Sequence, residues 1–194
     1  DCFYLYEEAK IRAAANRLRE DFAGADFLYS IKANPHPLVL KTVLSQGFGA
    51  DGASLAEVPA AQAAGLPPGQ LQYSAPGQTQ RDLAGALGRC ILIADSLGEI
   101  DRIQSLAEAA GTPVRIGVRL HPDFAFSGEA AAPSKFGIDA AQFFAQVARL
   151  RALSHVKICG LHVHLRSQEL DAGVLTRYHA RLFGLAEQFE HVLG

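Results

Sequence analysis

The sequence predicts an α/β protein in which strands and helices alternate around a parallel sheet. Three observations support this fold class. Short apolar runs of strand length alternate with longer segments of helical period. Ser-x-x-Glu motifs, which are typical of helix N-termini, follow two of the apolar runs. Glycines and the pair Pro67-Pro68 stand where helices would end.

The first half of the chain contains an opening helix and three strand–helix units. The run Phe27–Ile31 favours a strand, and Asn34-Pro35 is a turn signal that ends it. Ser54 and Glu57 match a capping box, which marks the start of a helix. The expected strands cover residues 27–32, 48–52 and 70–75, and the expected helices cover 7–20, 37–46, 55–64 and 79–87.

The second half contains three further units. A second capping box runs from Ser96 to Glu99, and Asp139 with Gln142 is a looser version of it. The expected strands cover residues 90–95, 114–120 and 156–165, and the expected helices cover 98–110, 140–152 and 172–191. Six βα units are therefore visible, whereas a closed (β/α)8 barrel contains eight.

Composition places the chain among ordinary globular proteins. Apolar residues make up 49% and charged residues 20% of its 194 residues, and the net charge is −2. This balance gives no reason to expect nucleic acid or an anionic membrane as a partner. No apolar run reaches the length of a membrane span, and the acidic start is no signal peptide. Cys2, Cys90 and Cys159 lack metal-ligand or redox spacing, which favours free thiols in a reducing cytoplasm and no metal site.

Lys32 is the first candidate for chemistry. If the first strand runs to residue 32, Leu28, Ser30 and Lys32 share its less apolar face. A lysine at this place can lose its proton through desolvation and act as an amine nucleophile. The alternative is a lysine that extends its side chain into water.

The other polar candidates lie on the later strands. Alternation gives each of these strands one face with polar side chains: Gly49 and Asp51 on the second, Arg115, Gly117 and Arg119 on the fifth, and Ile158, Gly160, His162 and His164 on the sixth. Barrel enzymes build their sites at the carboxyl ends of the strands. Lys32, Asp51, Arg119 and His164 are therefore expected to converge on one mouth. Arg119 could instead form a structural ion pair, for example with Asp51.

The segment Tyr29–Pro35 (Tyr-Ser-Ile-Lys-Ala-Asn-Pro) resembles the lysine strand of the fold type III pyridoxal phosphate enzymes. These are the diaminopimelate, ornithine and related amino-acid decarboxylases, and alanine racemase. Further segments resemble the family's motifs in the same order: Phe3–Tyr6, Gly49–Asp51 with Ser54 and Glu57, Ser74–Thr79, Arg119–Asp123, Ser134–Asp139 and His162–Gln168. Residues 127–130 stand where related enzymes have a longer loop that contains glycine and methionine.

The resemblance implies a (β/α)8 TIM-type barrel of the alanine racemase-like kind. Residues 1–194 would form most of a pyridoxal phosphate-binding barrel, without the last barrel strands and the C-terminal β domain. A protein that ended at Gly194 would then bind the cofactor poorly and associate through an open sheet edge. The family further implies a homodimer in which the partner subunit completes the active site.

The resemblance also assigns roles to single residues. Lys32 would hold pyridoxal 5′-phosphate as a Schiff base, and His164 would stack on its pyridine ring. Asp51, Arg119 and Ser167 would be further cofactor contacts, with Ser167 at the phosphate. Ser54 and Glu57 are assigned to the helix cap and Lys135 to the surface, outside the site.

Arg166 departs from the family, because decarboxylases of this group have glycine there. It would bind a substrate carboxylate or the cofactor phosphate, or else crowd the pocket. Arginine also removes the access to positive φ that glycine has.

The implied function is pyridoxal phosphate-dependent decarboxylation of an amino acid or an amino-acid-derived substrate. Two alternatives lie within the family: an amino-acid racemase, and a non-catalytic homologue that acts as a binding protein. A third alternative is a metal-dependent hydrolase that uses the pair His162 and His164, although no third ligand is evident. An absorbance band of bound cofactor is expected for the decarboxylase or the racemase and not for the hydrolase or the non-catalytic homologue, while the sequence leaves the identity of the small-molecule substrate open.

Overall fold

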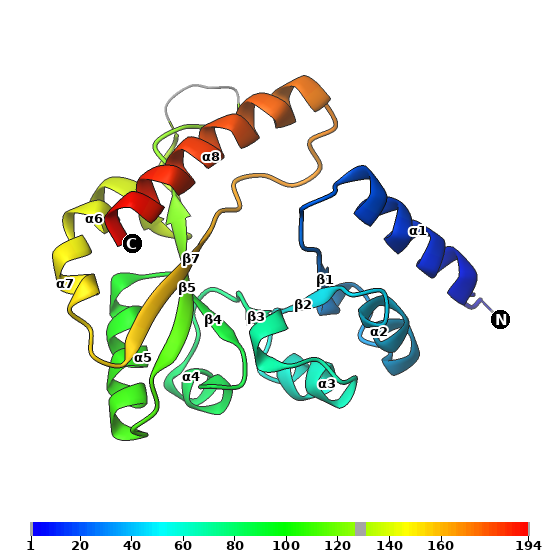
Figure 1. Ribbon diagram of the computed structural model, residues 1–194, viewed down its shortest axis with the longest axis horizontal. Coiled ribbons are helices and arrows are strands. Elements are labelled where there is room, and N and C mark those ends of the chain that lie inside the picture. Colours follow the sequence, from blue (N-terminus) through cyan, green and yellow to red (C-terminus); the bar gives the residue numbers. More distant parts are fainter. Residues whose placement is uncertain (1, 127–130, 194) are drawn as a thin grey trace. The chain divides into compact units, whose positions relative to one another are not determined.

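The computed structural model describes residues 2–126 and 131–193, so the predicted short loop at 127–130 lies outside the described residues. Helices alternate with parallel strands along the chain, which confirms the predicted α/β class (Figure 1). The chain divides into two compact units. The first consists of residues 1–75 and 85–92, and the second of residues 76–84 and 93–194.

Unit 1 begins with a helix and then pairs its short strands in parallel. Its elements are α1 (Glu8–Asp21), β1 (Leu28–Ser30), the 3₁₀ helix η1 (Ile31–Ala33), α2 (Pro37–Leu44), β2 (Gly49–Gly52), α3 (Glu57–Ala63), η2 (Pro68–Gln70) and β3 (Leu71–Tyr73). The register places Ser30 beside Asp51 and Asp51 beside Gln72. Partners in a parallel ladder point to the same face, so these three polar residues form one layer.

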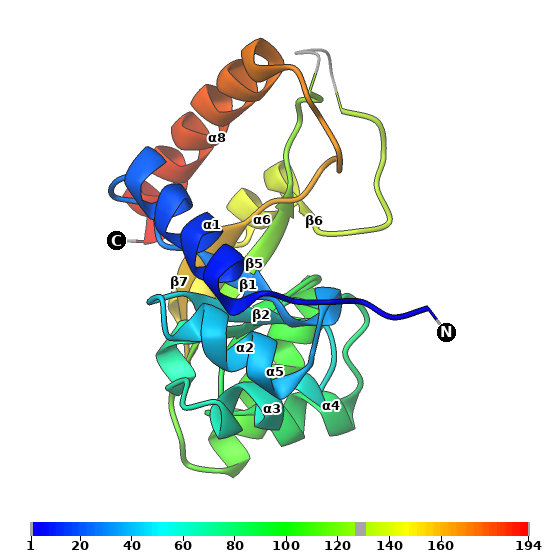
Figure 2. The ribbon, with the colours of Figure 1, turned by 90° about the vertical axis from the view of Figure 1, so that its right-hand side faces the viewer.

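Unit 2 is built around the long strand β5. Its elements are α5 (Leu97–Ala109), β5 (Val114–His121), β6 (Ile138–Asp139), α6 (Ala140–Ala145), α7 (Val147–Arg151), β7 (Val156–His162) and α8 (Ala172–Leu193), while α4 (Gln80–Ala86) and β4 (Ile91–Ala94) cross from one unit to the other. Strand β5 pairs in parallel with β7 and, at its end, with β6. Helix α8 packs on α7 and β7 (Figure 2).

Each unit buries its own apolar side chains. In unit 1, Phe27 and Phe48 stack with ring centroids 5.2 Å apart, in a cluster that also holds Ala15 of α1. In unit 2, the ring of Phe143 stacks on that of Phe189 at 5.6 Å and so joins α6 to α8. Burial of apolar surface stabilises the folded state by about 25 cal/mol per Å². These apolar contacts hold in place the strands whose ends carry the candidate site residues. No helix in the described part of the chain has the length and apolar character needed to cross a membrane.

The six predicted strands are all present, but four end earlier than predicted, and two of these four precede candidate site residues. Strand β1 ends at Ser30, and Lys32 lies in the 3₁₀ turn that follows it rather than on the strand. Strand β7 ends at His162, so His164 also lies beyond its strand. Both side chains are therefore positioned by turns, and the period of the strand does not fix their direction.

A β-bulge in β7 corrects the predicted face of this strand. Ile116 pairs with Ile158, but the next residue, Gly117, pairs with Gly160, so Cys159 is the extra residue. Ile158 therefore shares the face of Ile116 and not, as predicted, that of Gly160. The bulge leaves His162 on the face of Arg119, since these two residues are register partners.

The cysteines match the prediction of free thiols. All three are free: Cys90 is buried, Cys159 is half-buried and Cys2 is exposed. Burial raises the pKa of the Cys90 thiol to about 12, which keeps it protonated and unreactive.

The helix starts agree with the predicted caps only in part. The Ser96 hydroxyl accepts a hydrogen bond from the Glu99 amide at 3.2 Å, as predicted for α5. Helix α3 instead begins at Glu57, and the Ser54 hydroxyl donates to the Glu57 carboxylate, so this motif stabilises the turn before the helix. Asp139 makes no side-chain cap. The predicted helix 140–152 is two short helices that meet at Gln146.

Gly49 gives a test of the strand packing in unit 1. A Cβ atom there would lie 2.4 Å from Leu28 Cδ2 and 2.5 Å from the Gln70 carbonyl oxygen, and the backbone oxygen cannot move aside without shifting β3. We expect Gly49→Ala to lower the free energy of unfolding by about 1–3 kcal/mol in a urea titration. Gly98→Ala is the control, because no heavy atom lies within 4 Å of its added Cβ. An equal loss in both variants would contradict the packing argument.

Candidate active site

Lys32 presents an exposed amine just beyond the carboxyl end of β1. The turn around it is held in place on both sides. Ile31 is fully buried, and the Tyr29 hydroxyl donates to the Asn34 carbonyl at 3.1 Å. Within the described residues no ion pair joins Lys32 to a carboxylate. The amine is therefore accessible on a fixed backbone, as a lysine that reacts with a carbonyl compound requires.

Asp51 is the centre of a small hydrogen-bond network in unit 1. Its Oδ1 atom accepts from the Gln72 amide at 3.0 Å and from the Ser74 hydroxyl at 2.6 Å. Both partners come from β3 or its end, and the sequence analysis did not name them as site residues. The predicted strand 70–75 carried the signal, because alternation places Gln72 and Ser74 on one face.

Arg119 is buried at the end of β5, with only 8% of its surface exposed. Its Nη1 atom lies 3.5 Å from Asp95 Oδ1, and its Nη2 atom donates to the His164 carbonyl at 3.4 Å. The guanidinium also lies 4.8 Å from the centre of the Phe136 ring. The structural ion pair that the sequence allowed for Arg119 is therefore present, but its partner is Asp95.

Asp95 follows β4 and was not predicted as a site residue. Besides Arg119, it accepts a hydrogen bond from the Gly137 amide at 3.1 Å on the same oxygen, Oδ1. Burial raises the pKa of the Asp95 carboxyl above its ordinary value, although Arg119 and the Gly137 amide act in the opposite direction.

Glu99 is a buried carboxylate close in the chain to the half-buried Asp95. It accepts from the backbone amides of Asp95 at 2.6 Å and Gln78 at 3.1 Å, while Arg102 lies 3.6 Å away. Burial is the largest influence on its pKa and raises it, against the hydrogen bonds and Arg102. Glu99 therefore joins the turn before α4 to the end of β4.

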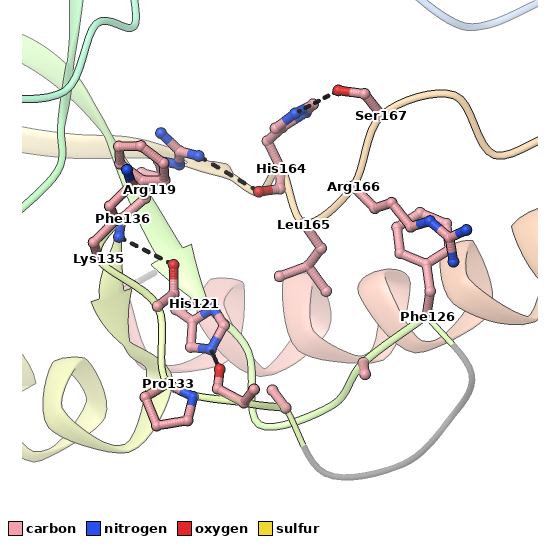
Figure 3. A pocket seen from close by; sticks show the side chains of 14 residues that line it. Arg119, His121, Phe126, Pro133, Lys135, Phe136, His164, Leu165, Arg166 and Ser167 are labelled. Carbon is pink, nitrogen blue, oxygen red and sulfur yellow. Dashed lines mark hydrogen bonds between the residues drawn. The ribbon is translucent and has the colours of Figure 1, made fainter.

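A cavity of about 670 Å³ opens in unit 2 beside Arg119 and His164. Figure 3 shows His164 and Ser167 together on one part of its wall, and Arg119 beside Phe136 and Lys135 on another. None of the described residues that line it is an aspartate or glutamate, and three of them are cationic: Arg119, Lys135 and Arg166. Lys135 is exposed, as predicted, but it also belongs to this wall. The cavity therefore favours an anionic ligand.

His164 and Ser167 lie together in the segment that follows β7. The Ser167 hydroxyl is 3.3 Å from His164 Nε2, and both residues are exposed. Arg166 lies between them in the chain and forms an ion pair with Glu169 at 3.3 Å. Among the described non-glycine residues, only Gln168 has a positive φ, of 61°. The backbone at Arg166 thus does not need the conformation for which glycine is preferred.

The predicted site residues fall into two sets. Arg119, His164, Arg166 and Ser167 line one cavity of unit 2. Lys32 and Asp51 belong to unit 1. The convergence of both sets on one mouth stays a prediction. In the described residues, no cluster of three or more His, Cys, Asp or Glu side chains could hold a metal ion.

The chain matches the family model of the pyridoxal-dependent decarboxylase, pyridoxal binding domain, over residues 8–194. It is 31% identical over 175 residues to diaminopimelate decarboxylase of Aquifex aeolicus, which is 87% of this chain and 42% of that protein. It is 32% identical over 176 residues to L-glutamyl-[BtrI acyl-carrier protein] decarboxylase of Niallia circulans, which is 87% of this chain and 41% of that protein.

The solved structures give the same result. Diaminopimelate decarboxylase from Helicobacter pylori, complexed with L-lysine, matches with a TM-score of 0.86 and 25% identity. This match covers 98% of the present chain and 50% of that one. The chain thus spans half the length, or less, of the relatives named here.

The raised pKa of Glu99 makes a signed prediction about stability. The unfolded state gives up this proton more readily than the folded state, so ionisation of Glu99 lowers the free energy of unfolding. In a titration from about pH 3 to pH 7, wild type should lose stability relative to Glu99→Gln as the pH rises through the raised folded-state pKa.

Asp82 provides the control of opposite sign. Its hydrogen bonds with Thr79, first through the side chain, lower the pKa of the carboxyl. Wild type should therefore lose stability relative to Asp82→Asn as the pH falls below about 4. Chemical denaturation at each pH measures both differences. A Glu99 profile with the slope of the Asp82 profile would show that the contacts of Glu99 outweigh its burial.

Proposed function

The chain belongs to the pyridoxal-dependent decarboxylases through their pyridoxal-binding domain, and on this premise we propose that it decarboxylates an amino acid or an amino-acid-derived substrate. Lys32 is the proposed Schiff-base lysine. We place the enzyme in the cytoplasm as a homodimer whose partner subunit completes the site. The observation that carries the proposal is the exposed Lys32 amine, which has no ion-pair partner among the described residues and lies on a fixed turn at the end of β1.

The residues of both units suit pyridoxal 5′-phosphate, the cofactor of the family. A primary amine, a flat ring and donors for an anion are needed to hold an aromatic aldehyde that carries a phosphate. Lys32 offers the amine, His164 an exposed imidazole, and Ser167 a hydroxyl at the edge of a cationic cavity. When bound, the cofactor supplies an electron sink for the carbanion that loss of CO₂ creates.

The side chains around these groups have positioning and electrostatic tasks. Asp51 is fixed by Gln72 and Ser74, so its carboxylate is available as an oriented acceptor on the face that also carries Ser30. Arg119 holds the backbone of His164 and thereby the position of the imidazole. The Ser167 hydroxyl at 3.3 Å from Nε2 helps to orient the ring itself.

The charges of the cavity favour a substrate with a free carboxylate. Arg119 is compensated by Asp95, whereas Lys135 has no carboxylate partner in the described residues. Arg166 is 62% exposed, so its pair with Glu169 is weak and can be exchanged for a ligand. Arginine binds a carboxylate through two parallel hydrogen bonds, which makes Arg166 the proposed contact for the substrate carboxylate or the cofactor phosphate.

Reduction with borohydride tests the role of Lys32. The amine that holds the cofactor becomes permanently labelled, and peptide mapping of the intact, cofactor-loaded protein should place the label on Lys32. Lys135→Ala should keep the label, because Lys135 lines the cavity only in the role of a cation. Lys32→Ala should lose it together with the cofactor absorbance. A label on Lys135 or Lys157 in the wild type would refute the assignment.

The glycine variant tests the role of Arg166. Loss of the guanidinium should weaken substrate binding by about 1–3 kcal/mol, seen as a higher KM, while the cofactor stays bound. Arg166→Lys keeps the charge but not the planar guanidinium, so its KM should lie between those of wild type and Arg166→Gly. If Arg166→Gly gains cofactor occupancy or activity, Arg166 crowds the pocket, and the non-catalytic binding protein becomes the better reading.

A further inference from the structure

Asp95 does not line the cavity, yet it contacts the residues that form two of its walls. We propose that Asp95 is the positioning residue of the site, and that its single oxygen Oδ1 fixes both the Ser134–Gly137 loop and, through Arg119, the backbone of His164. The positioning by Asp95 follows from these contacts, and only its role in catalysis rests on the proposed function.

The first wall depends on a close approach of the loop to β5. Gly137 has φ +80°, and a Cβ atom there would lie 3.0 Å from the backbone nitrogen of His121 and 3.1 Å from the carbonyl carbon of Leu120. The Gly137 amide donates to Asp95 Oδ1 at 3.1 Å. This hydrogen bond therefore holds the loop against β5, at a distance that a residue with a Cβ atom would not fit. It thereby keeps Ser134, Lys135 and Phe136 on the cavity wall.

The second wall depends on a carbonyl that lies beyond the sheet. Strand β7 ends at His162, so the His164 carbonyl is outside the strand ladder, and Arg119 donates to it at 3.4 Å. The same guanidinium is held by Asp95 and rests on the Phe136 ring. Movement of Arg119 would therefore shift the imidazole and the aromatic ring together.

Charge and burial make Asp95 effective in this place. The side chains of Asp95 and Arg119 are 14% and 10% exposed, so water and salt screen their attraction less than that of a surface pair. An asparagine of the same shape would offer one neutral oxygen to the same two donors. It would hold the guanidinium less firmly, and a hydrogen bond to a neutral acceptor is weaker than one to a carboxylate.

Hydrogen exchange of the cofactor-free protein tests the positioning directly. In Asp95→Asn, the Gly137 amide should exchange about 10- to 100-fold faster than in wild type and the NMR resonance of the His164 carbonyl carbon should shift, while helices α5 and α8 keep their protection. Asp101→Asn is the control, since Asp101 pairs with Arg149 on the surface, away from the cavity. An unchanged exchange rate at Gly137 together with an unchanged His164 resonance, or faster exchange throughout the chain, would overturn the proposal.

A second variant tests the two walls of the cavity one at a time, and it replaces Asp95→Asn if that variant does not fold. Arg119→Lys keeps a cation for Asp95 but loses the fork that reaches the His164 carbonyl. The His164 carbonyl resonance should then shift, while the exchange rate at Gly137 stays unchanged. Faster exchange at Gly137 in this variant would contradict the proposal that Asp95 holds the Ser134–Gly137 loop independently of Arg119.

The cofactor-loaded enzyme provides the functional measurement. In Asp95→Asn, kcat should fall about tenfold or more because of the misplaced imidazole, with KM within about threefold of wild type. The circular dichroism band of the bound cofactor should change, and Asp101→Asn should change neither quantity. An unchanged kcat and band would overturn the catalytic purpose of the positioning. If wild type bound no pyridoxal phosphate, the proposed function would fail while the exchange result would stand.

Discussion

The partly buried pair between Asp95 and Arg119 is the interaction on which the described part of the site depends. It joins the end of β4 to the end of β5, and its two members reach the Gly137 amide and the His164 carbonyl. A charge in this position requires compensation, and burial does raise the pKa of Asp95. The groups that compensate this charge are Arg119, which lines the cavity, and the Gly137 amide, which follows a lining residue. The contacts of one carboxylate therefore determine where the residues around His164 lie.

Parallel pairing determines what lies at these strand ends. In unit 1 the register brings Ser30, Asp51 and Gln72 into one layer, and Gly49 makes room for Leu28 in the layer below. In unit 2 the same rule places Arg119 beside His162, with His164 just beyond. The proposed cofactor would use residues of both edges, since an amine, an imidazole and a set of cations are what a phosphorylated aromatic aldehyde needs.

The sequence predicted the six strands because each apolar run has strand length and a helix-period segment after it. It also predicted that Arg119 lies near the carboxyl end of its strand, where β5 carries it. The turn at Lys32 escaped prediction, because Phe27–Ile31 continues the strand pattern past the point where η1 begins. The bulge at Cys159 escaped too, since the alternation of residues on both sides of it looks unbroken.

Asp95 was missed for a different reason. Beside the capping serine Ser96 it resembles an ordinary polar residue before a helix, and its partners Arg119 and Gly137 are 24 and 42 residues away in the chain. Only tertiary structure brings such partners together. The Arg166 substitution was visible in the sequence, whereas its pair with Glu169 and its ordinary φ were not.

A crystal structure of the intact protein loaded with pyridoxal phosphate tests the central claim most directly, because that claim joins residues of both units. We expect continuous electron density between the Lys32 amine and the cofactor, with the His164 ring against the pyridine and Ser167 at the phosphate. A cofactor that occupies the cavity beside Arg119 and His164 while Lys32 stays in solvent would contradict it, as would a cofactor bound to any other lysine.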